Sequence, residues 1–99
     1  MENYENRLNY LANNYQEFFS FMQKKYPVFK DSNIFLRDVQ YAIYSFFLNK
    51  GYQLKYSESE NLAYSFLEKL FSDSKLKKIS PNTWKLNFSV TADVIEINN

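Results

Sequence analysis

The sequence predicts a small α+β domain in which three helices are followed by a C-terminal β-hairpin. Three segments carry apolar residues at helical spacing, whereas Trp84, Leu86 and Phe88 alternate with polar residues, as in a half-buried strand. The chain has 99 residues, which is the length of one domain. Aromatic residues make up 20% of it, which predicts a packed core and not a disordered chain. We therefore expect a single domain over residues 1–99.

The first helix is expected over residues 2–24, within an N-terminal amphipathic segment that covers residues 1–25. Its apolar residues are spaced alternately by four and three positions, which is a heptad seam, and Pro27 ends the helix because the residue before a proline avoids the helical conformation. A helix of this length spans about 35 Å, roughly the width of a domain of this size. It therefore either packs across the domain or overhangs it and supports self-association. The seam consists of Tyr4, Leu8, Leu11, Tyr15, Phe18 and Met22.

The second helix is expected over residues 33–50, with Asp31 or Ser32 as its N-terminal cap. Gly51 follows Lys50 at the point where a helix needs a left-handed residue to end. Both faces of this helix are apolar, which is typical of a helix in the middle of its domain, so we expect it to lie between the other two helices. One face carries Phe35, Val39, Ala42, Ile43 and Phe46, and the opposite face carries Tyr41, Tyr44 and Leu48 beside Arg37.

The third helix is expected over about residues 58–72. Ser57 and Glu60 have the spacing of a capping box, in which each side chain satisfies a backbone amide of the other residue. Residues 52–56 alternate apolar and polar side chains, with Tyr52 and Tyr56 at the ends and Leu54 in the middle, which fits either a short strand or an ordered connection.

The hairpin is expected from residues 76–79 and 83–90, with Pro81 and Asn82 in the turn. Residues 91–99 either add an edge strand or fray. The core should unite the apolar residues of the second and third helices with those of the hairpin. We expect it to contain Val39, Ile43, Phe46, Leu62, Phe66, Leu70, Trp84 and Leu86.

The order helix, helix, helix, hairpin resembles a winged helix-turn-helix domain over about residues 33–90. The resemblance depends on Leu67 and Leu70, followed by the strand pattern of residues 76–79 and 84–86, which looks like a recognition helix and its wing. It implies a winged-helix-like fold. Two features differ from the DNA-binding members: the connection before the third helix is longer, and Glu58 and Glu60 would meet phosphates at its start. The sequence is more similar to winged-helix domains that bind proteins.

Composition excludes several kinds of site. The chain has no histidine, no cysteine and one glycine, so it lacks the residues for zinc fingers, histidine-based triads and glycine-rich phosphate loops. Carboxylates occur as the pairs Glu58/Glu60 and Asp93/Glu96, but no nucleophile has a visible base. We expect no enzymatic activity, no cofactor, no metal and no small-molecule substrate.

The sequence also bears on location and origin. It contains neither a secretory signal nor an apolar run that would span a membrane, so we expect a cytoplasmic protein with no membrane contact. Its high content of Lys, Asn, Phe, Tyr and Ile fits the codon bias of an AT-rich genome. A gene of phage or mobile-element origin in such a host is the alternative explanation.

Arg37, Tyr41, Tyr44 and Leu48 are the candidate partner-binding residues. Tyrosine and arginine anchor protein interfaces because they bury a large area and keep a polar group. The partner would be another protein or a second copy of the chain. The alternative is that the first helix covers this face inside the monomer.

Lys75, Lys77, Lys78 and Lys85 are the candidate nucleic-acid-binding residues. No acidic residue occurs between positions 75 and 90, so these lysines form a basic hairpin on which Trp84 could stack a base. The alternative is that Lys77 and Lys78 protect an edge strand from aggregation while Trp84 lies in the core.

The leading functional hypothesis is a non-catalytic protein-interaction module: a small subunit, an accessory protein, or a regulator or inhibitor that binds a larger partner. The alternative is a nucleic-acid-binding winged-helix regulator that uses the basic hairpin. The net charge of +1 and the acidic start of the third helix favour the first hypothesis.

Overall fold

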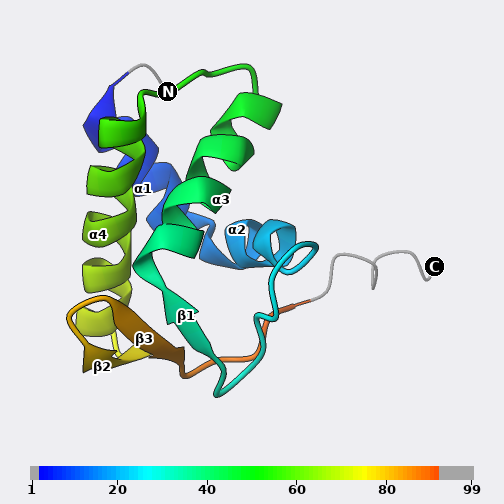
Figure 1. Ribbon diagram of the computed structural model, residues 1–99, viewed down its shortest axis with the longest axis vertical. Coiled ribbons are helices and arrows are strands. Elements are labelled where there is room, and N and C mark those ends of the chain that lie inside the picture. The colour runs from blue at the N-terminus through cyan, green and yellow to red at the C-terminus, as the bar shows by residue number, and fades with distance from the viewer. Residues whose placement is uncertain (1–2, 92–99) are drawn as a thin grey trace.

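The computed structural model describes residues 3–91, which form four helices and a three-stranded antiparallel sheet (Figure 1). The α+β class is confirmed. The layout differs from three helices and a hairpin, because the first helix is divided and a strand precedes α3. The elements are α1 (Tyr4–Asn13), α2 (Tyr15–Met22), β1 (Asn33–Phe35), α3 (Leu36–Asn49), α4 (Tyr56–Ser72), β2 (Leu76–Ser80) and β3 (Thr83–Leu86).

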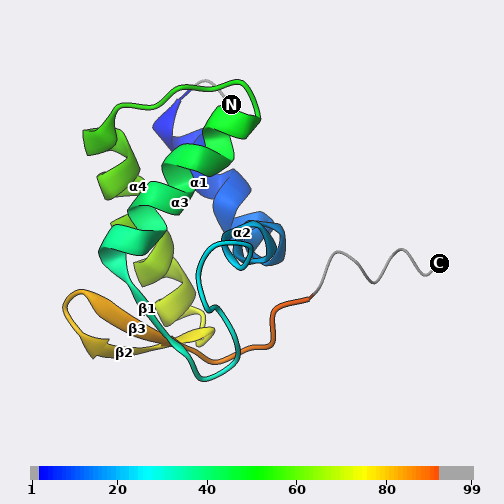
Figure 2. The same cartoon turned by 45° about the vertical axis from the view of Figure 1, so that its right-hand side comes forward.

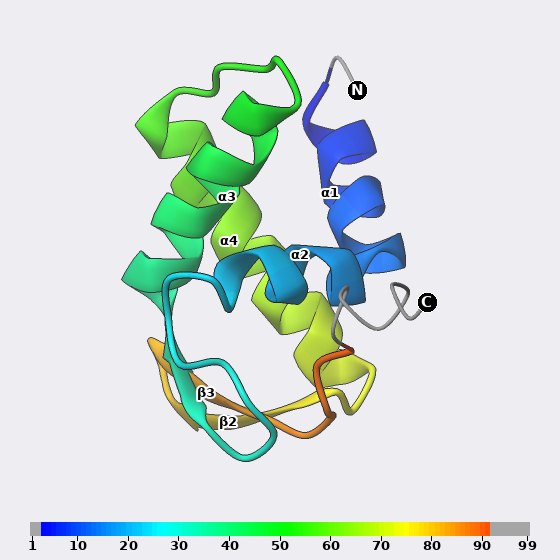
Figure 3. The ribbon, with the colours of Figure 1, turned by 90° about the vertical axis from the view of Figure 1, so that its right-hand side faces the viewer.

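The expectation of one continuous helix over residues 2–24 is wrong, because the chain turns at Asn14. This residue leaves the helical region, with φ −126° and ψ 38°, and its side-chain amide donates to the Tyr10 carbonyl at 2.9 Å. Asparagine favours such breaks because its side chain competes for backbone hydrogen bonds. After the turn, α2 runs across the molecule at a steep angle to α1 (Figure 3).

The Glu17 carboxylate holds α2 in this orientation. It accepts a hydrogen bond from the Tyr10 hydroxyl of α1 at 2.8 Å and another from the Lys50 ammonium at 3.1 Å. Lys50 follows the last residue of α3, so one carboxylate joins three helices. The hydrogen bond to Glu17 raises the pKa of Lys50, which keeps the ammonium charged.

The turn at Asn14 brings Phe18 to the centre of the core. Its ring lies edge-to-face with Phe46 of α3 and with Phe66 of α4, at centroid distances of 5.4 Å in both pairs. Phe19 packs beside it at 5.2 Å, and both side chains are completely buried. Edge-to-face pairs of this kind add to the stabilisation from apolar burial. The short α2 therefore connects the two longest helices.

The strand β1 was not expected from the sequence. It pairs antiparallel with β3, with Ile34 opposite Trp84, so the sheet order is β1-β3-β2. Because β1 comes first, Phe35 is the N-cap of α3, and the prediction of Asp31 or Ser32 as the cap is wrong. Asp31 has a φ of 70° and Ser32 bonds the backbone of Phe29, so both residues belong to the turn before the strand.

The predicted end of the second helix is confirmed, whereas the predicted start of the third is wrong. Gly51 follows α3 with a φ of +92°, the left-handed conformation that glycine favours. The capping box is not formed: α4 begins at Tyr56 with Lys55 as its N-cap, so Ser57 lies inside the first turn. Residues 52–55 form an ordered connection without strand structure, and Leu54 is buried.

The predicted hairpin is present as β2 and β3, with Pro81 and Asn82 in its turn. The second strand is shorter than expected and ends at Leu86. Beyond it, Phe88 packs edge-to-face on Tyr15 at a centroid distance of 5.1 Å. The expectation for residues 91–99 lies outside the described residues, apart from Thr91.

The predicted core is confirmed. Its eight residues are all buried, and Phe46 is the most exposed of them at 3%. The helices enclose this core, and the sheet covers it at the end where α4 leads into β2 (Figure 1).

Replacing Phe66 by alanine is expected to lower the free energy of unfolding by about 3–5 kcal/mol, because the cavity would remove contacts with both Phe18 and Phe19. The matched control is Phe71→Ala on the same helix, where the side chain is 42% exposed and the loss should be below about 1 kcal/mol. Urea denaturation followed by circular dichroism measures both. Equal losses in the two variants would contradict the assigned core.

Candidate functional site

The four candidate partner-binding residues lie in one row along α3 and face solvent; we call them the α3 surface. Tyr41 is 46% exposed and Leu48 is 48% exposed, Arg37 is exposed, and Tyr44 is half-buried. As expected, α3 lies between other helices: α4 packs on one side of it and α2, the second part of the predicted first helix, packs on another (Figure 2). The alternative that the first helix covers this row is wrong, because Tyr41 and Leu48 are exposed.

Tyr56 extends the α3 surface, and the sequence reasoning missed it. Its ring stacks on Tyr44 at a centroid distance of 4.9 Å and an interplanar angle of 20°. The Gln40 amide donates to the Tyr56 carbonyl at 3.4 Å, which holds the start of α4 against α3. Tyr56 is 60% exposed. The alternation of apolar and polar side chains over residues 52–56, which ends at Tyr56, was the only sign of this role in the sequence.

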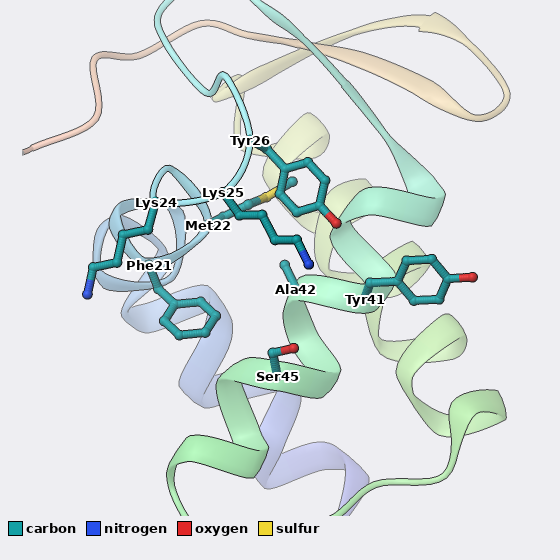
Figure 4. Close-up of a pocket in the computed structure, with 8 residues that line it drawn as sticks. All are labelled: Phe21, Met22, Lys24, Lys25, Tyr26, Tyr41, Ala42 and Ser45. Atoms are coloured by element: carbon teal, nitrogen blue, oxygen red, sulfur yellow. The ribbon is translucent and has the colours of Figure 1, made fainter.

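A small pocket opens beside the α3 surface, between the end of α2 and α3 (Figure 4). Its volume is about 140 Å³. Clefts that bind small organic ligands usually measure about 300–1,000 Å³. The pocket is lined by Phe21, Met22, Lys24, Lys25, Tyr26, Tyr41, Ala42 and Ser45.

The rim of this pocket is basic. Lys24 and Lys25 are exposed, and neither forms an ion pair with a carboxylate of residues 3–91. Lys25 extends along the Tyr26 ring, with its nitrogen 6.0 Å from the centroid (Figure 4). Burial raises the pKa of the Tyr26 phenol, and Asp38 and Tyr41 raise it further, so the phenol stays neutral and can donate a hydrogen bond. The pocket was not predicted from the sequence, in which the run Lys24-Lys25-Tyr26 before Pro27 is the only sign of it.

The structure does not bring the four hairpin lysines together as one site. Lys78 donates to Glu68 of α4 at 2.7 Å, and this hydrogen bond raises its pKa. Lys75 lies over the Tyr15 ring at 5.1 Å from its centroid. Trp84 is completely buried, as expected for a core residue, so it has no exposed face on which a base could stack.

Lys77 and Lys85 remain on the outer face of the sheet. They lie directly opposite each other on β2 and β3, and neither has a carboxylate partner in residues 3–91. Like charges in this position are unfavourable. The pair is the part of the basic hairpin that is open to an anion.

Helix α4 is engaged by α1 along its first half. Arg7 forms an ion pair with Glu58, and the Tyr4 hydroxyl contacts the Asn61 carbonyl at 3.1 Å and the Ser65 hydroxyl at 2.6 Å. The Glu58/Glu60 pair noted in the sequence therefore has one member neutralised by Arg7.

Residues 3–91 contain no group of three or more acidic side chains that would hold a metal ion. Over the same range, every helix is too short or too polar to cross a bilayer. The pair Asp93/Glu96 lies outside the described residues.

No protein-family model, curated protein or solved structure matches this chain.

Proposed function

We propose that this chain is a non-catalytic protein-interaction module that binds a partner chain through the α3 surface. The observation that carries the proposal is the row of Arg37, Tyr41, Tyr44 and Leu48 along the solvent side of α3, continued by Tyr56. A module of this kind acts as a small subunit, as an accessory protein, or as a regulator that blocks its partner.

The composition of the α3 surface supports this proposal. Tyrosine and arginine are enriched at the energetic centres of protein interfaces, and contiguous exposed apolar patches usually mark binding sites. Tyr44 and Tyr56 are already ordered by their stacking, so binding them costs little side-chain entropy. Leu48, 48% exposed, adds an aliphatic contact at the end of the row.

The resemblance to a winged-helix domain fits this function. The order of helical segments followed by the β2–β3 hairpin supports the resemblance, with β1 added to the sheet. In such a domain α4 would be the recognition helix. Its first half contacts Tyr4 and Arg7 of α1 instead, which favours a protein-binding member over a DNA-reading one.

Nucleic-acid binding through the hairpin is the second candidate, and the uncompensated pair Lys77 and Lys85 favours it. Two lysines release few counterions, so the affinity for a polyanion would be weak. Lys78 is bonded to Glu68, and Trp84 has no exposed face on which a base could stack. The protein-interaction function therefore has the stronger support.

The double variant Arg37→Glu/Leu48→Glu is expected to lose the partner, because it removes one cation and one apolar contact from the α3 surface. The matched control is Lys69→Glu/Phe71→Glu, which makes the same two changes at exposed positions of α4. Tagged wild type and both variants, expressed in the native host, are compared by quantitative mass spectrometry of the proteins retained. Partners retained equally by all three proteins would contradict the proposal, as would the absence of any retained protein together with a monomeric mass in light scattering.

No appreciable binding to DNA or RNA is expected at physiological salt. Fluorescence anisotropy with labelled duplex and single strands, at low and physiological salt, measures this. A salt-sensitive affinity that disappears when Lys75, Lys77, Lys78 and Lys85 are all replaced by glutamine would make nucleic-acid binding the better function.

A further inference from the structure

The pocket between α2 and α3 continues the α3 surface through a shared residue. Tyr41 belongs to the row on α3 and also lines the pocket, and Ser45 stands one turn further along the same helix. A chain that binds the α3 surface therefore passes the pocket's opening.

The size of the pocket selects its occupant. A cavity of about 150 Å³ in a protein core holds one benzene molecule. The volume here is about 140 Å³, so the pocket accommodates one branched aliphatic or aromatic side chain and not a larger ligand. Phe21, Met22 and Ala42 supply apolar contacts for it.

The charge around the pocket determines which partner residues fit next to that side chain. Lys24 and Lys25 stand on the rim without an ion pair in residues 3–91, and Arg37 lies on the neighbouring surface. Asp38 is the acidic group near Tyr26, on the same helix as Arg37. The phenols of Tyr26 and Tyr41 can both donate hydrogen bonds. Glu17 lies beside Lys24 but is paired with Lys50. Among the described residues, the three cations Lys24, Lys25 and Arg37 therefore outnumber the remaining carboxylate, so this rim complements a negative partner.

We propose that the pocket receives a bulky apolar side chain of a partner protein, flanked there by aspartate or glutamate residues that contact Lys24 and Lys25. This inference rests on the proposed function and specifies its partner. It also argues against a second copy of this chain, because a symmetric pair places the same patch on both sides and would bring the lysines of both copies together. The partner is an acidic, apolar segment of another protein.

Selection from displayed random peptides of about twelve residues tests the proposal on the intact chain. The selected peptides should combine a bulky apolar residue with neighbouring Asp or Glu. Ser45→Trp, which fills the pocket from an exposed position, and Lys24→Glu/Lys25→Glu should each weaken their binding at least about tenfold. The matched controls Ser57→Trp on α4 and Lys77→Glu/Lys85→Glu on the sheet should leave it unchanged.

Nuclear magnetic resonance of the wild type gives a second measurement that needs no variant. Titration with 4-methylpentanoate, which joins a branched 3-methylbutyl group to a carboxylate, should shift the amide signals of residues 21–26 and 41–45. The amide 4-methylpentanamide, which is neutral, should shift them less. Equal effects of the two compounds, or shifts elsewhere in the molecule, would overturn the proposal.

The outcomes separate this inference from the proposed function. Peptides without acidic residues, peptides that bind Ser45→Trp as well as wild type, or a failure to select any peptide would overturn the pocket's role. Selected peptides of the first two kinds could still lose affinity for Arg37→Glu/Leu48→Glu. In that case the α3 surface binds protein, and only the pocket proposal fails.

Discussion

The fold is organised around the packing of Phe18 against Phe46 and Phe66. This packing requires the chain to leave the direction of α1, and the turn at Asn14 provides that change. Because of this turn, α1 packs against α4 while α2 packs against α3. A single straight helix would lie along one neighbour only. The division of the N-terminal helix thus decides which side of α3 is buried and which side is left for a partner.

The sequence predicts those parts of the fold that local patterns encode. Apolar periodicity identified the helices and the hairpin, and the eight core residues are all buried. The end of α3 followed from Gly51, because only one type of residue enters the left-handed region without strain. These features depend on residues close together in the chain.

The features that the sequence did not reveal depend on distant contacts. The heptad seam continues through Asn14 without interruption, and the break is fixed by the bonds of Glu17 to Tyr10 and Lys50. β1 has three residues, too few for an alternating pattern, and exists because β3 offers it an edge. The residue types identified the α3 surface as a candidate site. Its exposure could not be predicted, since both faces of that helix are apolar. The pocket beside it could not be predicted either, because it lies between residues 21–26 and residues 41–45, which are distant in the sequence.

The accessibility of two positions on α3 decides whether the α3 surface is open to a partner. The chain has no cysteine, so a single introduced thiol reports on one site. We expect Leu48→Cys, on the α3 surface, to react rapidly with a thiol reagent in the folded protein. Ala42→Cys, on the side of α3 that faces α2 and only 5% exposed, should react much more slowly. Equal protection of the thiols at positions 48 and 42 would show that the N-terminal helices cover the α3 surface, and would contradict its role in binding a partner.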